Sequence, residues 1–226
     1  MNDPNGLVWI GGRYHLFYQY YPDGVEWGPM HWGHASSADL LAWERLPVAL
    51  YPDSLGWIFS GSSVVDHADT AGFGAGALVA VFIYHDDSIA RRGRTDTESQ
   101  GLAWSLDGGI TWTKYAGNPV LRNSGERDLR DPKVLWNDRI GRWNMILAAG
   151  DRMKIYSSMN LVDWKHESDF IPEAEGFTGV WECPDLFPMK TDAGEAWVLV
   201  ASQTGNAPNG GSGTRWACPP RPGCCS

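Results

Sequence analysis

Three acidic residues of this chain share a local setting that could carry proton-transfer or nucleophilic chemistry. Asp3 and Asp131 each immediately precede a proline, and Glu182 lies two residues before Pro184. A residue that precedes proline is restricted to extended backbone, which fixes the direction of its side chain at the edge of a strand. Each acid is followed by a short run typical of a strand, at residues 7–10, 133–136 and 185–187. We therefore expect the three acids to occupy equivalent strand starts.

The neighbours of these acids predict different protonation states. Asp3 precedes a Pro-Asn-Gly turn, whose free N–H groups favour a carboxylate anion. Glu182 lies between Trp181 and a cysteine, an apolar setting that suits a protonated carboxyl. Asp131 follows Arg130, so we expect it to stay ionised and to accept hydrogen bonds from substrate hydroxyls. One ionised and one protonated carboxyl are what cleavage of a glycosidic bond needs.

Asp-Pro is also a common turn sequence, so any one of these acids could be purely structural. Pro22-Asp23 and Pro52-Asp53 are interpreted as turns of that kind. The repeated context of the other three acids, each beside a polar or aromatic residue, favours a shared site.

The elements that must position these acids are short strands. Apolar runs bounded by Gly, Pro, Asp and Asn clusters predict strands at residues 7–10, 14–21, 78–84, 133–136, 143–149, 153–158 and 196–202. The one stretch with possible helical periodicity is residues 38–46. The fold class is therefore predicted to be all-β.

A repeated turn sequence refines this prediction. The pattern Ser-x-Asp/Asn followed four or five residues later by Trp occurs three times, ending at Trp43, Trp112 and Trp164. The Asp or Asn side chain can form the turn, and the Trp is expected to start the next strand and to pack inward. Repeats that each contain one four-stranded unit are typical of propeller blades, whereas a β-sandwich does not need a recurring turn. A β-propeller is favoured, in which the acids converge on the central channel.

Six segments, in order, resemble the motifs of glycoside hydrolase family 32, the β-fructosidases, which include invertases, inulinases and levanases. They are Met1–Gly6, Tyr18–Tyr20, Trp32–His34, Phe59–Ser62, Arg130–Pro132 and Trp181–Asp185. The resemblance covers roughly residues 1–214. It implies a five-bladed propeller, usually followed by a β-sandwich domain.

The resemblance also implies an activity and a set of site residues. The reaction would be retaining hydrolysis of a terminal β-fructofuranosyl unit of a fructan or sucrose, without metal or cofactor. Asp3 would be the nucleophile, Glu182 the acid/base, and Asp131 the stabiliser of the transition state, helped by Arg130. Asn2, Gln19, Trp27 and Ser60 look like fructose-binding residues, and Phe59 like an apolar wall. Retention predicts the carboxyls of Asp3 and Glu182 about 5–5.5 Å apart.

Some of these predicted binding residues could instead have purely structural roles. Trp27 could be an ordinary surface aromatic, and Gln19, within an aromatic run, could be a buried polar group serving the fold. His31 and His34 form an H-x₂-H pair, but no third ligand is evident, so we predict no metal site.

Length and composition bound the organisation of the chain. At roughly 55–60 residues per blade, 226 residues hold about three blades and part of a fourth, so we expect an incomplete propeller that turns over substrate poorly by itself. Residues 1–214 are assigned to the propeller. Residues 215–226, in which three of the four cysteines are crowded, are interpreted as an unrelated or disordered tail. Those cysteines lack a C-x₂-C partner, which argues against zinc.

The net charge of −9 argues against nucleic acid or an anionic membrane as partner. The expected partner is a fructose-containing oligo- or polysaccharide. Many members of the family are secreted, although the first residues here are not a signal peptide. Two alternatives remain: a non-catalytic carbohydrate-binding propeller, and an enzyme of another type, either a fructosyltransferase or a sialidase. A sialidase needs an arginine cluster, and Arg130 is the one arginine within a motif.

Overall fold

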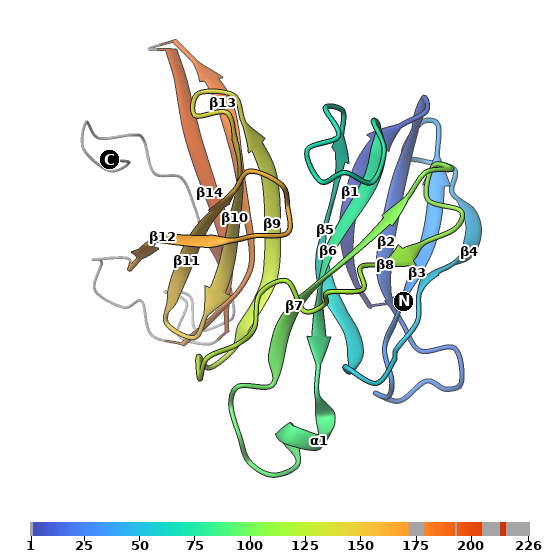
Figure 1. Ribbon diagram of the computed structural model, residues 1–226, viewed down its shortest axis with the longest axis vertical. Coiled ribbons are helices and arrows are strands. Elements are labelled where there is room, and N and C mark those ends of the chain that lie inside the picture. Colours follow the sequence, from blue (N-terminus) through green and yellow to red (C-terminus); the bar gives the residue numbers. More distant parts are fainter. Residues whose placement is uncertain (1, 172–178, 193, 205–212, 216–226) are drawn as a thin grey trace.

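The computed structural model describes residues 2–171, 179–192, 194–204 and 213–215. Four antiparallel sheets follow one another along this part of the chain (Figure 1). The first sheet contains β1 (Asn2–Ile10), β2 (Arg13–Tyr20), β3 (His31–Ser37) and β4 (Glu44–Leu50). The second contains β5 (Trp57–Asp66), β6 (Ala77–His85), β7 (Glu98–Ser105) and β8 (Thr113–Lys114). The third contains β9 (Leu129–Asn137), β10 (Arg142–Ala149), β11 (Arg152–Ser158) and β12 (Lys165–Phe170). The fourth contains β13 (Val180–Thr191), β14 (Gly194–Thr204) and β15 (Gly213–Arg215).

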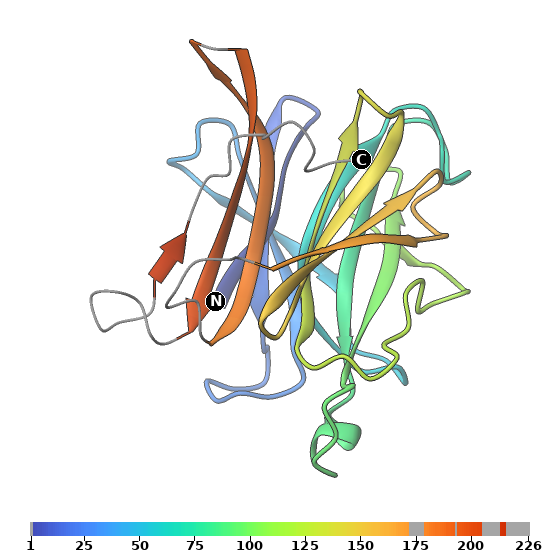
Figure 2. The same cartoon turned by 90° about the vertical axis from the view of Figure 1, so that its left-hand side faces the viewer.

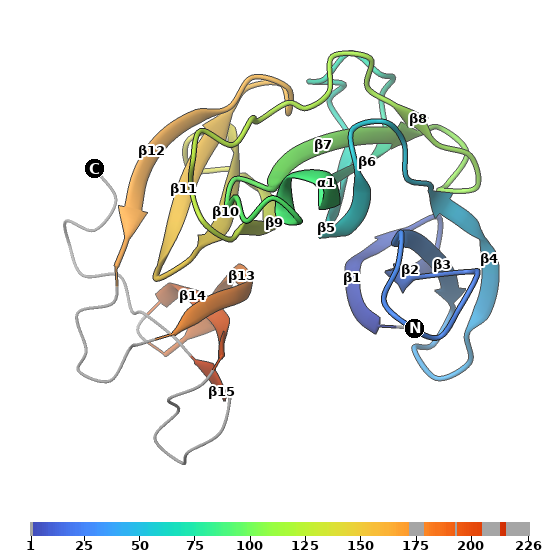
Figure 3. The same cartoon turned by 90° about the horizontal axis from the view of Figure 1, so that it is seen from below.

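The sheets are arranged as blades around a common centre. Seen from below, β1, β5, β9 and β13 face that centre, and β4, β8 and β12 lie at the rim (Figure 3). β5 contacts both β1 and β9, and β9 contacts β13. Each sheet pairs its strands in sequence order, so the first strand of every blade is innermost. The prediction of an all-β, partial β-propeller is confirmed, and every strand expected from sequence lies within an observed one, except that the strand predicted at 14–21 ends one residue earlier, at Tyr20.

The hydrophobic core lies between blades rather than within one sheet. Phe17, Trp32 and Phe82 belong to a cluster between the first two blades. Leu102, Met145 and Leu147 belong to a second cluster between the next two. β6, whose residues are all buried, contributes to both. Packing of one blade on the next therefore sets the positions of the inner strands relative to one another.

The predicted turn recurs between the third and fourth strands of the three complete blades. In the first blade, the Ser37 hydroxyl accepts hydrogen bonds from the backbone N–H groups of Asp39 and Leu40. The Asp39 carboxylate accepts from the backbone N–H groups of Leu41 and Ala42. Trp112 and Trp164 pack against the clusters between blades, as expected. The inward packing predicted for Trp43 is wrong: the residue is 38% exposed, since no preceding blade lies beside it among the described residues.

Helical structure departs from expectation in two places. Residues 38–46 form the turn and the start of β4, because the side chain of Asp39 holds the backbone in the turn. A single helical turn, α1 (Asp87–Ala90), is not predicted by the sequence pattern; Asp86 caps it by accepting hydrogen bonds from two backbone N–H groups. Figure 2 shows this turn projecting beyond the end of its sheet. Within the described ranges, no helix is long and apolar enough to cross a membrane.

β15 ends at Arg215, the first residue of the predicted tail, and the rest of that tail lies outside the described residues.

Candidate active site

Every innermost strand carries an irregularity of pairing at the same end. The register shifts between Asn2 and Pro4 in β1, between Phe59 and Gly61 in β5, and between Glu182 and Asp185 in β13. In β9 it shifts after Arg130, opposite β10 residues 146–148. A bulge places an extra residue in one strand, so two consecutive side chains can face the same way instead of alternating.

These bulges build one cavity of about 250 Å³, lined by two adjacent residues from each inner strand. The four pairs are Asn2 and Asp3, Phe59 and Ser60, Arg130 and Asp131, and Glu182 and Cys183. Gln19, Trp27 and Met30 complete the lining. All nine residues predicted for the site therefore lie around a single cavity, although the first and last of them are 180 positions apart in the sequence.

The backbone at the bulges differs from the expectation for residues that precede proline. Asp3, Asp131 and Cys183 have positive φ angles of 32°, 57° and 49°. The predicted extended conformation is therefore wrong for Asp3 and Asp131. A positive φ angle is strained in a residue other than glycine. Such strained residues are concentrated at functional sites, where the surrounding structure holds them in place. Pairing of the strand on both sides of the bulge imposes it here.

The bulges also correct the predicted equivalence of the three acids. Asp3 and Asp131 immediately precede proline, and in β13 that position is occupied by Cys183. Glu182 occupies the preceding position, which is Arg130 in β9 and Asn2 in β1. Glu182 still faces the cavity because the bulge allows both residues of the pair to do so.

The electrostatic centre of the site is Arg130. Its Nη2 lies 3.0 Å from Oε1 of Glu182, and its Nη1 lies 3.2 Å from Oδ1 of Asp128. Two expectations need correction here. The carboxylate of Glu182 is paired with a cation rather than set among apolar groups, because the Trp181 side chain is buried instead in the cluster between the third and fourth blades. The ion pairs of Arg130 go to Glu182, Asp128 and, at 4.0 Å, Glu98 rather than to Asp131.

Asp131 is held by the neighbouring blade. The backbone N–H of Cys183 donates a hydrogen bond to Oδ2 of Asp131 at 2.9 Å, and the thiol lies 3.6 Å from the same oxygen. Burial raises the pKa of Asp131 above its ordinary value, while this hydrogen bond and the charge of Arg130 act in the opposite direction. Desolvation, and then the adjacent Asp131, raise the pKa of the Cys183 thiol to about 12, so the thiol is protonated at neutral pH.

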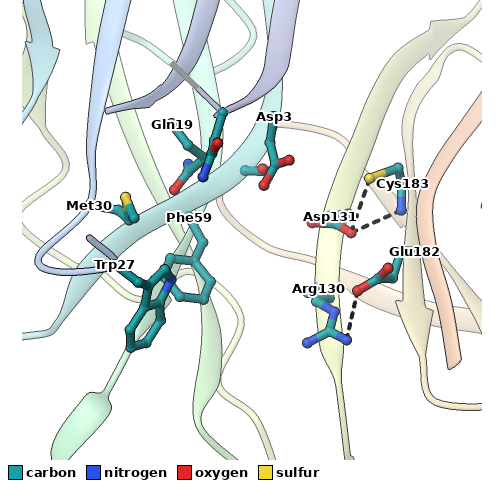
Figure 4. Close-up of a pocket in the computed structure, with 11 residues that line it drawn as sticks. Asp3, Gln19, Trp27, Met30, Phe59, Arg130, Asp131, Glu182 and Cys183 are labelled. Atoms are coloured by element: carbon teal, nitrogen blue, oxygen red, sulfur yellow. Dashed lines mark hydrogen bonds and ion pairs between the residues drawn. The ribbon is translucent and has the colours of Figure 1, made fainter. Parts of the chain in front are cut away.

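The opposite wall of the cavity is largely aromatic. Asp3 and Gln19 lie across the cavity from Arg130, Asp131 and Glu182, with Trp27 and Phe59 near them (Figure 4). The Phe59 ring stacks on buried His85 at 4.4 Å between centroids, and the exposed Trp27 ring meets Trp57 edge-on at 4.6 Å. Apart from Asp3 and Gln19, this wall is therefore apolar, and the facing wall carries Arg130, Asp131 and Glu182, an arrangement suited to a sugar ring.

Two residues that line the cavity were missed from sequence, Met30 and Cys183. Pro184, by analogy with the two Asp-Pro sequences, could have indicated Cys183; no comparable signal marks Met30. His31 donates a hydrogen bond from Nδ1 to the carbonyl of Pro29, while His34 faces His15 at 2.9 Å. In the portion of the chain that is described, no three His, Cys, Asp or Glu side chains group as metal ligands.

Fold and site together define a β-propeller with an acidic, aromatic-walled cavity at its centre. The family model of the glycosyl hydrolases family 32 N-terminal domain matches residues 1–216. The chain belongs to this family.

Curated relatives agree with that assignment. The chain is 53% identical over 222 residues to a levanase of Bacillus subtilis, covering 96% of this chain and 32% of the relative. It is 43% identical over 243 residues to an extracellular exo-inulinase of Aspergillus niger, covering 96% of this chain and 45% of the relative. It thus spans a third to a half of the length of these two proteins.

Solved structures share the fold. A β-fructofuranosidase of Schwanniomyces occidentalis in complex with fructosyl-erythritol superposes with a TM-score of 0.84 and 33% identity, covering 97% of this chain and 45% of that chain. An exo-inulinase of Aspergillus awamori gives a TM-score of 0.82 and 36% identity, covering 100% and 51%.

Proposed function

We propose that the protein is a glycoside hydrolase that releases terminal β-D-fructofuranosyl units from fructans or sucrose with retention of configuration. The observation that carries the proposal is that Asp3 faces Glu182, Asp131 and Arg130 across one cavity (Figure 4). A cavity of about 250 Å³ suits a single sugar unit, and two carboxyls on opposite sides of it match the requirement of double displacement.

The proposed reaction has two steps. The Asp3 carboxylate attacks the anomeric carbon of the fructosyl unit while the bond from that carbon to the leaving oxygen breaks. Glu182 donates its proton to that oxygen, so the remainder of the substrate leaves as an alcohol. Glu182 then removes a proton from water, and the resulting nucleophile displaces Asp3 and regenerates both groups. No cofactor is required.

The other residues of the cavity have binding roles in this proposal. Asp131 accepts hydrogen bonds from ring hydroxyls and strengthens them as positive charge develops in the transition state. Arg130 keeps Glu182 oriented toward the leaving oxygen. The fructosyl unit is bound by Asn2, Gln19, Trp27 and Ser60, with Phe59 as the apolar wall.

The substrate class is inferred from relatives that are named levanase, exo-inulinase and invertase. We propose action outside the cell, because the Aspergillus relatives are named extracellular. Incubation with sucrose, inulin and levan, followed by analysis of products, distinguishes the substrates. Binding without release of fructose would instead favour a carbohydrate-binding propeller, and accumulation of longer oligosaccharides would favour a fructosyltransferase.

The roles of the two central acids are tested by Asp3→Asn and Glu182→Gln. Each variant should lower kcat by at least about a thousandfold, because the first removes the nucleophile and the second the proton donor. The exposed Asp138→Asn, in the turn after β9, serves as control and should retain wild-type turnover. NMR of the first product of the wild type should show the β-anomer of fructose. Near-normal turnover in either acid variant, or initial formation of the α-anomer, would overturn the mechanism.

A further inference from the structure

Glu98 is a buried carboxylate that stands behind the cavity without lining it. It is the first residue of β7, and its side chain is 5% exposed. Its strand partner is His85, the last residue of β6, whose ring stacks on the cavity wall at Phe59. Glu98 therefore lies directly under the aromatic side of the site.

The same carboxylate reaches the charged side. Its Oε1 lies 4.0 Å from Nη1 of Arg130 and 3.6 Å from Nδ1 of His85. Among the residues described, Arg130 is the one permanently charged cation within ion-pair distance of Glu98. The guanidinium thus has Glu98 and Asp128 at one nitrogen and Glu182 at another.

This arrangement has an energetic reason. A carboxylate with almost no exposure is costly to bury unless a cation compensates it. The side chain of Arg130 is itself only 22% exposed, so it needs anions around it in turn. Because a guanidinium is a planar, rigid fork, anchoring one nitrogen restricts where the others can point.

We propose that Glu98 is a positioning residue for the reaction: together with Asp128 it anchors the guanidinium of Arg130, which in turn holds the carboxyl of Glu182 and sets how readily that carboxyl keeps its proton. The inference rests on the proposed function, in which Glu182 is the acid/base. It assigns a role to a side chain that contacts neither substrate nor reacting atoms.

Charge balance gives the direction of the effect. One guanidinium is shared by three carboxylates, so removal of the charge on Glu98 leaves more positive potential at Glu182. The ionised form of Glu182 is then favoured, so Glu182 loses the proton that it donates in the reaction at a lower pH than in the wild type. The other charged or titratable groups facing this cluster are His85 from β6, Asp131 from β9, Arg127 and Asp128 just before it, Asp3 from β1 and Cys183 from β13.

The test compares Glu98→Gln with the wild type and with Glu195→Gln. Gln keeps the shape of Glu98 and one acceptor oxygen, but it replaces the other oxygen by an N–H₂ donor and removes the charge. Glu195, on β14, forms an exposed ion pair with Arg139 at 2.8 Å and supplies the matched control. The readouts are kcat, KM and the pH profile of kcat/KM on the substrate found active, with thermal unfolding measured in parallel.

For Glu98→Gln we expect kcat to fall about three- to tenfold with little change in KM, and the basic limb of the pH profile to move to lower pH by on the order of half a unit. Glu195→Gln should leave the profile unchanged. A Glu98→Gln profile that superposes on the wild type after correction for the folded fraction would overturn the proposal, since a purely structural role alters only that fraction.

A second measurement separates this inference from the proposed function. If the wild type releases no fructose, the proposed function fails, and the ¹³C carboxyl resonance of Glu182 is then titrated in the wild type and in Glu98→Gln. A lower titration midpoint in the variant supports the positioning role, and an unchanged midpoint refutes it.

Discussion

Arg130 links two acidic side chains of different blades at the site. The nearest carboxylate of each terminal nitrogen is a different one, Glu182 on β13 and Asp128 just before β9. Lysine could satisfy one of these anions but not both, because its ammonium is a single point charge rather than a fork. The geometry of this one side chain therefore couples the third blade to the fourth at the cavity.

Arg130→Lys should consequently lower kcat/KM by about ten- to a hundredfold without abolishing folding, since the positive charge remains. Steady-state kinetics on the active substrate, together with circular dichroism, would measure both effects. The equivalent change in an exposed ion pair, Arg139→Lys, should be silent. Full activity of Arg130→Lys would show that the fork geometry has no catalytic role.

At the scale of elements, two local devices produce the site. The bulge at the start of each inner strand brings neighbouring side chains to the same surface, and the repeated Ser-x-Asp/Asn turn joins the third and fourth strands of a blade. In the second blade, Asp107 accepts hydrogen bonds from the N–H groups of Ile110 and Thr111 and from the Thr111 hydroxyl. These donors lower the pKa of Asp107 to about 2. The turn therefore depends on one side chain that accepts hydrogen bonds from backbone N–H groups.

Asp107→Ala should destabilise the protein by about 1 kcal/mol, the usual cost of removing such an acceptor. Asp107→Asn should cost much less, because Asn160 fills the same position in the third blade and accepts from two backbone N–H groups there. Urea unfolding followed by tryptophan fluorescence would compare the two variants. Equal destabilisation by Ala and Asn would mean that charge, rather than the hydrogen bonds, stabilises the turn.

At the scale of the whole molecule, stability depends on the interfaces between blades. His34 of β3 illustrates this: it is fully buried, stacks on Phe17 at 4.3 Å and lies 2.9 Å from His15. A Cβ placed on Gly109, in the turn of the second blade, would lie 3.1 Å from its ring. Burial, and then the nearby His15, lower the pKa of His34 to about 3. The imidazole is therefore neutral within a packed interface.

This depressed pKa predicts loss of stability in acid. Between the ordinary value of 6.5 and about 3, the unfolded chain binds a proton that the folded protein excludes, so the free energy of unfolding falls as the pH falls through this range. In His34→Gln the fall should be shallower, whatever the absolute stability of the variant. Exposed His67→Gln should keep the wild-type slope. Unfolding in urea at several pH values between 7 and 4 would measure both slopes, and parallel slopes for wild type and His34→Gln would contradict the assignment.

The sequence alone was sufficient for the class of fold, the repeated turn, and nine of the eleven residues that line the cavity. Strand periodicity and turn chemistry are local properties, and the ordered motifs identify the family. Tertiary structure alone decided that Arg130 pairs with Glu182 instead of Asp131, that Cys183 occupies the position equivalent to Asp3, and that Glu98 lies behind the site. These features depend on bulges and on the packing of one blade against the next. Both are set by contacts between segments far apart in the chain, which no local pattern records.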